Sequence, residues 1–193
     1  MLIDRITHFL GKRREIINRL RILHIIDHFY PVLGYQETFL AKAHSRDDEV
    51  LTITSDRYVK ALYIANKSLL KRIRSSEASH VVRYPPLNKP WLVGLERTVV
   101  NFKPDIIIVH GVVNINSIRI ARLKSKLLNT NFIFDDHLTY NATRGSWTRM
   151  IYKVFKKIFT PMLLRAADLF VAAVSCETKR FMKEIYGIPA NRS

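Results

Sequence analysis

Residues 104–111 read PDIIIVHG, and this near-continuous apolar run is typical of a strand buried on both faces of a sheet. Five further short, apolar or β-rich runs resemble strands; they span 21–27, 49–55, 79–84, 131–137 and 167–175. Helical patterns separate these runs and span 35–45, 58–75, 90–102, 115–128, 146–165 and 176–187. This alternation predicts an α/β fold: a doubly wound, Rossmann-like parallel sheet with helices on both faces.

The composition of the chain excludes several other classes of protein. Its 193 residues suffice for one domain with a short extension. Hydrophobic residues make up 48% and charged residues 25%, which excludes a disordered or low-complexity chain. The single cysteine, Cys176, excludes an intramolecular disulfide and any multi-cysteine metal site.

The charge balance indicates an anionic partner. Lys and Arg number 32 against 16 Asp and Glu, so the net charge is +16. Nucleic acid, anionic lipid or a phosphorylated substrate would complement such an excess. No segment is long and apolar enough to span a bilayer, and the N-terminus lacks the order of a secretory signal. We therefore expect a cytoplasmic protein, either free or peripheral on the cytoplasmic face of a membrane.

The chain divides into two parts at about residue 20. Residues 1–20 form a basic, amphipathic segment, which is either a helix packed on the outside of the domain or a membrane-surface anchor. Residues 21–193 form the predicted Rossmann-like domain. No internal repeat and no linker rich in Gly, Ser or Pro interrupts them.

Polar side chains follow the predicted strands where their carboxyl ends would meet, which is the edge at which such folds bind ligands. These candidate cleft residues are Asp27, His28, His110, Asp135, Asp136, His137, Tyr140 and Ser175. The first strand is not followed by the G-x-G-x-x-G dinucleotide fingerprint, because only Gly34 is present there. Gly34 nevertheless stands just before a helix N-terminus, where backbone N–H groups favour an anion.

Four stretches together resemble family 4 glycosyltransferases of the GT-B fold. The first, 21–55, holds the loop Pro31-Val32-Leu33-Gly34-Tyr35-Gln36-Glu37, which is similar to the family's Pro-x-x-Gly-Gly-x-Glu loop. The others are KPDIIIVHG (103–111), FIFDDHLTY (132–140) and AADLFVAAVSCETKRFMKEIYGIP (166–189). Their order and spacing match the family, and the resemblance covers nearly all of 21–193.

The resemblance implies a retaining transfer of a sugar from a nucleotide-sugar donor to a lipid-linked or envelope glycan acceptor, with no cofactor and no required metal. It places Gly34 near the donor phosphates, Glu37 at the start of the first helix, and His137 in the active site facing the sugar. Tyr35 stands where the family has the second glycine of the loop. A bulky side chain at this position narrows the space through which the loop backbone could approach a phosphate. The chain ends where the family continues into a donor-binding domain, so we expect an acceptor-side half that needs that domain or a partner subunit.

The predicted helix 146–165 carries basic residues without any acid between residues 144 and 165. Its apolar residues recur at helical spacing, from Trp147 to Leu163, and are expected to pack against the sheet. The opposite face would then present Arg149, Lys153, Lys156 and Lys157. No nucleic-acid recognition motif accompanies this face, so an anionic membrane surface is the favoured partner over nucleic acid.

Two alternatives to the glycosyltransferase stay open at this point. The chain could be a non-catalytic binding subunit that recruits an acceptor or a membrane to a partner transferase. Alternatively, a metal-dependent hydrolase could use Asp27, His110, Asp135 and His137 as hard ligands for a divalent ion.

Overall fold

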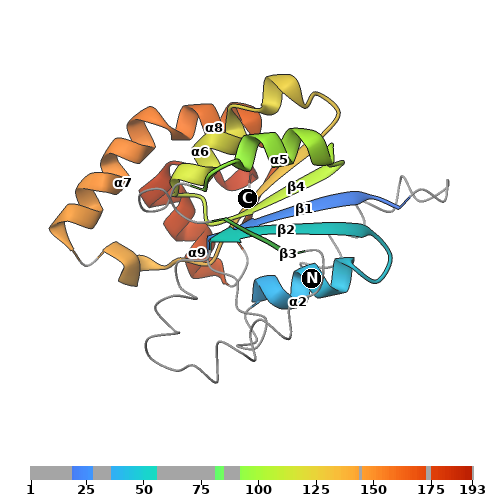
Figure 1. Cartoon of the computed structure of the whole chain (residues 1–193). Helices are drawn as coiled ribbons and strands as arrows, with labels where there is room; N and C mark the ends of the chain where they lie inside the picture. The colour runs from blue at the N-terminus through green and yellow to red at the C-terminus, as the bar shows by residue number, and fades with distance from the viewer. Residues whose placement is uncertain are drawn as a thin grey trace, which may run out of the picture.

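A computed structural model describes residues 19–27, 36–55, 81–84 (backbone only), 92–143, 145–172 and 175–192. Six strands form one parallel sheet in the order β3-β2-β1-β4-β5-β6 (Figure 1). The strands are β1 (Arg21–Ile26), β2 (Glu49–Ser55), β3 (Val81–Tyr84), β4 (Ile106–His110), β5 (Asn131–Asp136) and β6 (Leu169–Ala172). This strand order is that of a Rossmann-like fold and confirms the predicted parallel sheet.

Helices cover both faces of the sheet, as the alternating pattern predicts. They are α2 (Gln36–His44), α5 (Leu95–Phe102), α6 (Ile115–Ala121), α7 (Ser146–Ile158), α8 (Thr160–Ala166) and α9 (Cys176–Phe181). Four short turns complete the described elements: η1 (Lys124–Lys126), η2 (Tyr140–Thr143), η3 (Met182–Tyr186, a π-helical turn) and η4 (Ala190–Arg192). In Figure 1, α5, α6 and α8 lie above the sheet and α2 lies below it.

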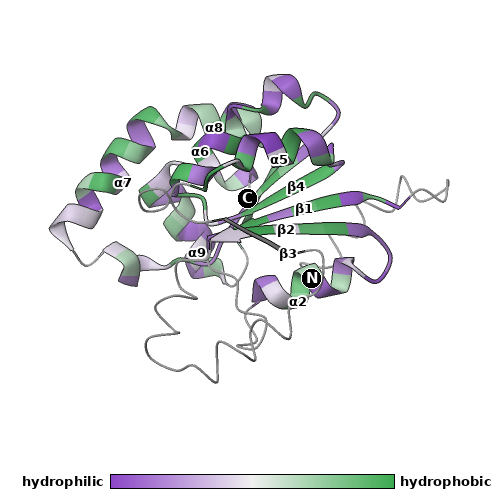
Figure 2. Ribbon diagram, viewed as in Figure 1, coloured by the Kyte–Doolittle hydropathy of each residue, from purple (hydrophilic) through white to green (hydrophobic). Residues whose placement is uncertain are grey.

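Two clusters of buried apolar residues correspond to the two faces. The larger cluster includes Leu23, Ile107 and Phe134 of the sheet and is completed by residues of the helices above it. The smaller cluster holds the alternate strand residues, such as Ile22 and Ile108. The strands are therefore apolar along most of their length, as the hydropathy colouring of Figure 2 shows.

Aspartates at the amino ends of the strands fix their starting points. Asp48 accepts a hydrogen bond from the Leu20 amide, and Asp105 accepts one from the Arg21 amide, at 3.1 and 2.8 Å. Asp168 accepts from the Phe132 amide at 2.7 Å. Each carboxylate thus ties its own segment to the neighbouring strand. Two of these aspartates belong to the stretches 103–111 and 166–189, so those motifs contribute to the fold independently of any ligand.

Several predicted helices are shorter in the structure. The helix expected at 90–102 begins at Leu95, after Gly94 with a φ of 79°. The helix expected at 115–128 ends at Ala121 and is followed by the separate turn η1. Gly187, with a φ of 76°, closes the helical segment formed by α9 and η3, as predicted. The predicted helix 58–75 and residues 1–18 lie outside the described residues.

The prediction for residues 146–165 was wrong in two respects. The segment forms two helices instead of one, with the break at Phe159 just before Pro161 in the first turn of α8. The predicted apolar stripe is also only partly covered. Phe155 joins the core cluster that includes the sheet residues, and Tyr152 is buried with its ring against those of Phe181 and Tyr186.

The physical reason for this difference is the width of the apolar surface on α7. The rings of Phe181 and Tyr186 cover only a narrow face of the helix, and large apolar side chains also occupy the neighbouring face. Five of them are exposed: Trp147, Met150, Ile151, Val154 and Ile158. In the described part of the chain, no helix is both long and apolar enough to cross a membrane.

Candidate functional site

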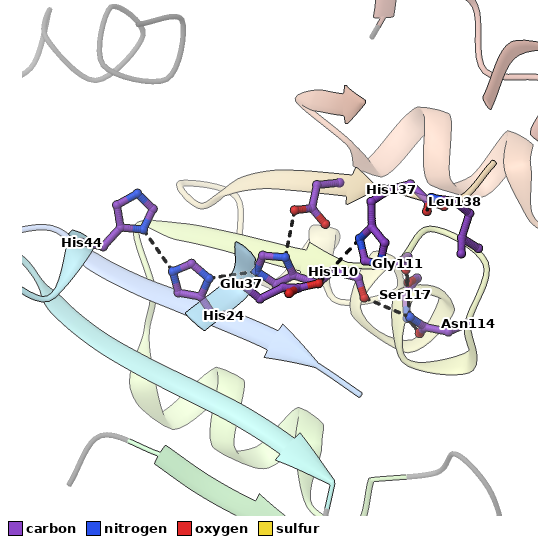
Figure 3. Close-up of polar contacts among 11 residues, drawn as sticks. His24, Glu37, His44, His110, Gly111, Asn114, Ser117, His137 and Leu138 are labelled. Carbon is purple, nitrogen blue, oxygen red and sulfur yellow. Dashed lines mark hydrogen bonds and ion pairs between the residues drawn. The ribbon is translucent and has the colours of Figure 1, made fainter. Parts of the chain in front are cut away.

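His137 and Glu37 meet at the carboxyl edge of the sheet, although 100 residues separate them in the sequence. His137 follows β5, and Glu37 lies in the first turn of α2. The His137 Nδ1 atom lies 3.6 Å from Oε1 of Glu37 (Figure 3). The His137 side chain is 47% exposed and that of Glu37 only 15%. A half-exposed imidazole is therefore oriented by a largely buried carboxylate.

A row of three histidines runs along the sheet toward the same edge (Figure 3). His44, the last residue of α2, places its Nδ1 3.0 Å from Nε2 of His24 in β1. His24 in turn places its Nδ1 3.0 Å from Nε2 of His110, the last residue of β4. The row ends at Asp135 of β5, whose Oδ2 lies 2.8 Å from Nδ1 of His110.

The row connects the half-buried side chain of His44 to the buried carboxylate of Asp135. His24 and His110 are almost fully buried, whereas His44 is partly accessible. Burial lowers the pKa of His44, and the nearby ring of His110 acts in the same direction, while the charge of Asp48 opposes both. The second carboxylate oxygen of Asp135, Oδ1, is buried and has no hydrogen-bond partner within the described residues.

Asp136 is fully buried beside the row's end. Its Oδ1 accepts a hydrogen bond from the Leu138 amide at 2.8 Å, which shapes the loop that carries His137. Burial raises the pKa of the Asp136 carboxyl, and the Leu138 amide and the Tyr186 hydroxyl partly offset this rise. The main contribution of Asp136 to the site is thus to hold the His137 loop.

Asp27, at the end of β1, belongs to a second polar network. Its Oδ1 accepts a hydrogen bond from Nδ2 of Asn116 in α6 at 2.8 Å. Burial raises the Asp27 pKa, and the Asn116 amide opposes that rise. Asn116 also accepts a bond from Arg119, whose guanidinium pairs with both carboxylate oxygens of Glu96 in α5. The network links β1 to α5 and α6.

A tight turn connects β4 to α6 directly after His110. Gly111 adopts a φ of 93°, in the left-handed region that favours glycine. Its carbonyl oxygen accepts hydrogen bonds from Nδ2 of Asn114 and from Oγ of Ser117, at 2.8 and 2.6 Å. Asn114 also caps α6 by accepting from the Ser117 amide. The turn is therefore fixed by its own side chains.

Two predicted cleft residues have structural partners. The Tyr140 hydroxyl donates to Oε2 of Glu184, and this bond is the main reason that the pKa of Tyr140 is raised. Ser175 is exposed and caps α9 by accepting a hydrogen bond from the Thr178 amide at 3.2 Å. Both residues therefore stabilise helical segments near the edge.

The remaining predicted loop residues, His28, Gly34 and Tyr35, lie outside the described residues. His24 and His44, in contrast, were not predicted to belong to the site. His24 did carry a signal, because it is the single polar residue between Ile22 and Ile26 of β1. Its contact with His110 could be predicted only from the strand order, which places β1 beside β4.

The four residues of the hydrolase alternative do not form one cluster. Asp27 bonds to Asn116, whereas His110 contacts Asp135 and His137 lies beside Glu37. Within the described part of the chain, no group of three or more His, Cys, Asp or Glu side chains is arranged to hold a metal ion.

The four predicted basic residues of α7 are all exposed. Two of them are tied back to the domain: Arg149 donates to the Thr143 carbonyl, and Lys156 donates to the Glu184 carbonyl, each at 2.9 Å. Lys153 and Lys157 lie on the exposed surface of the helix.

Comparisons with protein-family models, with curated proteins and with solved structures give no match.

Proposed function

We propose that this chain is the acceptor-side domain of a retaining glycosyltransferase, which transfers a sugar from a nucleotide-sugar to a lipid-linked or envelope glycan acceptor. The observation that carries the proposal is the contact between His137 and Glu37 at the carboxyl edge of a Rossmann-like sheet. The resemblance to family 4 glycosyltransferases implies that His137 is the active-site histidine and that Glu37 belongs to the donor and acceptor loop at the start of the first helix. The edge is also where such sheets bind ligands.

The geometry suits His137 as a hydrogen-bonding group for a sugar. Glu37 faces Nδ1 of the ring, and among the described residues no hydrogen bond is made by the other ring nitrogen, which can therefore serve a ligand. In the proposed reaction His137 bonds a donor-sugar hydroxyl or the reacting centre and does not abstract a proton. Its partial exposure provides the access that this role requires.

The proposal assigns most of the donor binding to a second domain or a partner subunit, in keeping with the GT-B arrangement.

The test is a transfer assay with the full-length gene product. Radiolabelled nucleotide-sugars are incubated with the protein and native membrane lipids, and the label that enters the lipid fraction is counted. Removing a positioned hydrogen bond at a reacting centre lowers turnover by about a hundredfold or more, so His137→Ala should lose nearly all transfer. Glu37→Gln should show an intermediate loss.

Lys126→Ala, at an exposed position in η1, is the control and should transfer at the wild-type rate. Near-normal turnover in His137→Ala would remove His137 from the site. Retention of the acceptor lipid without transfer of any sugar would instead identify a non-catalytic binding subunit.

A further inference from the structure

The exposed apolar side of α7 is a feature of the described structure that the proposed reaction does not use. Its five members share one side of the helix at spacings i, i+3, i+4, i+7 and i+11, and we call them the α7 outer face: Trp147, Met150, Ile151, Val154 and Ile158. Trp147 is 73% exposed and Ile158 58%. Figure 1 shows α7 at the periphery of the molecule, and Figure 2 shows apolar bands along it.

This concentration is unusual for a surface helix. The described residues include nine large hydrophobic side chains that are well exposed, and five of them belong to the α7 outer face. The other four are distributed among other segments: Phe39, Val93, Val100 and Leu128. Single exposed apolar residues are ordinary, but a contiguous stripe marks an interaction surface.

The charge around the stripe identifies the partner. Lys153 and Lys157 are exposed on the same helix, and no acidic residue occurs between residues 144 and 165. Arg149 and Lys156 add two positive charges that hydrogen bonds hold close to the helix. An apolar stripe with a Trp, beside lysines and without acids, fits the interface of an anionic bilayer.

A second copy of this chain is a poorer partner for the same surface. Two molecules that each carry a net charge of +16 repel one another, and pairing α7 with α7 would bring their lysines together. An anionic lipid surface instead attracts the lysines and accepts the apolar side chains.

We infer that the α7 outer face inserts into the interfacial region of an anionic membrane, with α7 lying parallel to the surface and Lys153 and Lys157 contacting lipid headgroups. The loop that carries His137 precedes α7 in the sequence, so this docking would hold the carboxyl edge close to the lipid. The inference depends on α7 alone and does not require the proposed transfer reaction.

The test is co-sedimentation of the 193-residue chain with vesicles of phosphatidylcholine, with and without phosphatidylglycerol. We expect binding to the vesicles that contain phosphatidylglycerol and little binding to the others. Ile151→Gln/Val154→Gln removes apolar contact and should weaken binding at least about tenfold. Lys153→Gln/Lys157→Gln should weaken it about thirtyfold, since each lysine near a leaflet contributes about 1 kcal/mol.

Matched controls alter exposed residues elsewhere. Val100→Gln changes an exposed apolar residue of α5, and Arg122→Gln/Lys126→Gln removes two exposed charges near the end of α6. Both should bind as the wild type does, and circular dichroism should show native helix content in every variant. Wild-type binding by the Ile151→Gln/Val154→Gln variant would overturn the inference. So would self-association of the wild-type chain, without vesicles, that this variant abolishes.

Discussion

His44 makes the stability of the domain depend on pH. Burial lowers its folded-state pKa below the ordinary value of 6.5, and the neighbouring groups are Asp48, His24 and His110. The unfolded chain therefore binds more protons than the folded one when the pH falls below about 6.5. The stability associated with a neutral His44 is present above that pH and is lost as the pH falls toward the folded-state pKa.

Replacing this residue tests the argument directly. His44→Gln keeps a donor for Nε2 of His24 but does not titrate. We expect its free energy of unfolding to fall less than that of the wild type between about pH 8 and about pH 5. Urea unfolding at several pH values measures the difference. If the free energy of unfolding changed with pH by the same amount in both proteins, His44 would not contribute to the pH dependence of stability.

At the scale of elements, Arg119 connects α6 to α5. Its guanidinium is buried and bonds both oxygens of Glu96, with Nε at 2.6 Å from Oε1. The same side chain donates to Asn116, which in turn holds Asp27. Contact with Arg119 lowers the pKa of the Glu96 carboxyl.

A lysine cannot reproduce this planar set of donors. Arg119→Lys should lower the free energy of unfolding by about 1–3 kcal/mol, because hydrogen bonds to charged groups are lost. Arg122→Lys, three residues further along and exposed, should change it by less than about 0.5 kcal/mol. Equal effects of the two substitutions in urea unfolding would contradict a special role for Arg119.

Periodicity in the sequence predicted the elements better than their packing. The strands were recognisable because buried parallel strands are almost wholly apolar, as β4 is. The pattern of α7 located its apolar stripe, but it could not show that five members of the stripe are exposed and that the helix is buried at Tyr152 and Phe155. Burial depends on the aromatic contacts from α9 and η3, which are distant in sequence.

At the scale of the whole molecule, a net charge of +16 destabilises the compact state through self-repulsion. Sodium chloride screens this repulsion, so raising its concentration to about 0.5 M should raise the melting temperature by a few degrees. Differential scanning fluorimetry in sodium and potassium chloride checks the effect and controls for specific ions. A lower melting temperature would mean that local pairs, such as Lys124 with Asp168, outweigh the repulsion.

The candidate site was partly predictable because its residues follow strands, and topology alone brings such positions to one edge. His137, Asp135 and Asp136 could be placed in this way. The resemblance named His137 and Glu37 separately, and the contact between them was not predicted. The histidine row could not be predicted, since it requires the order of the strands and the end of α2 to be known together.

The histidine row also has a direction. Each neutral ring carries one N–H, so the three donors must all point toward Asp135 or all point away from it. The carboxylate of Asp135 accepts from Nδ1 of His110, which selects the first arrangement and makes Nε2 of His44 an acceptor. The tautomer of a half-buried ring at the end of α2 is therefore set by a carboxylate that lies on the far side of β1 and β4.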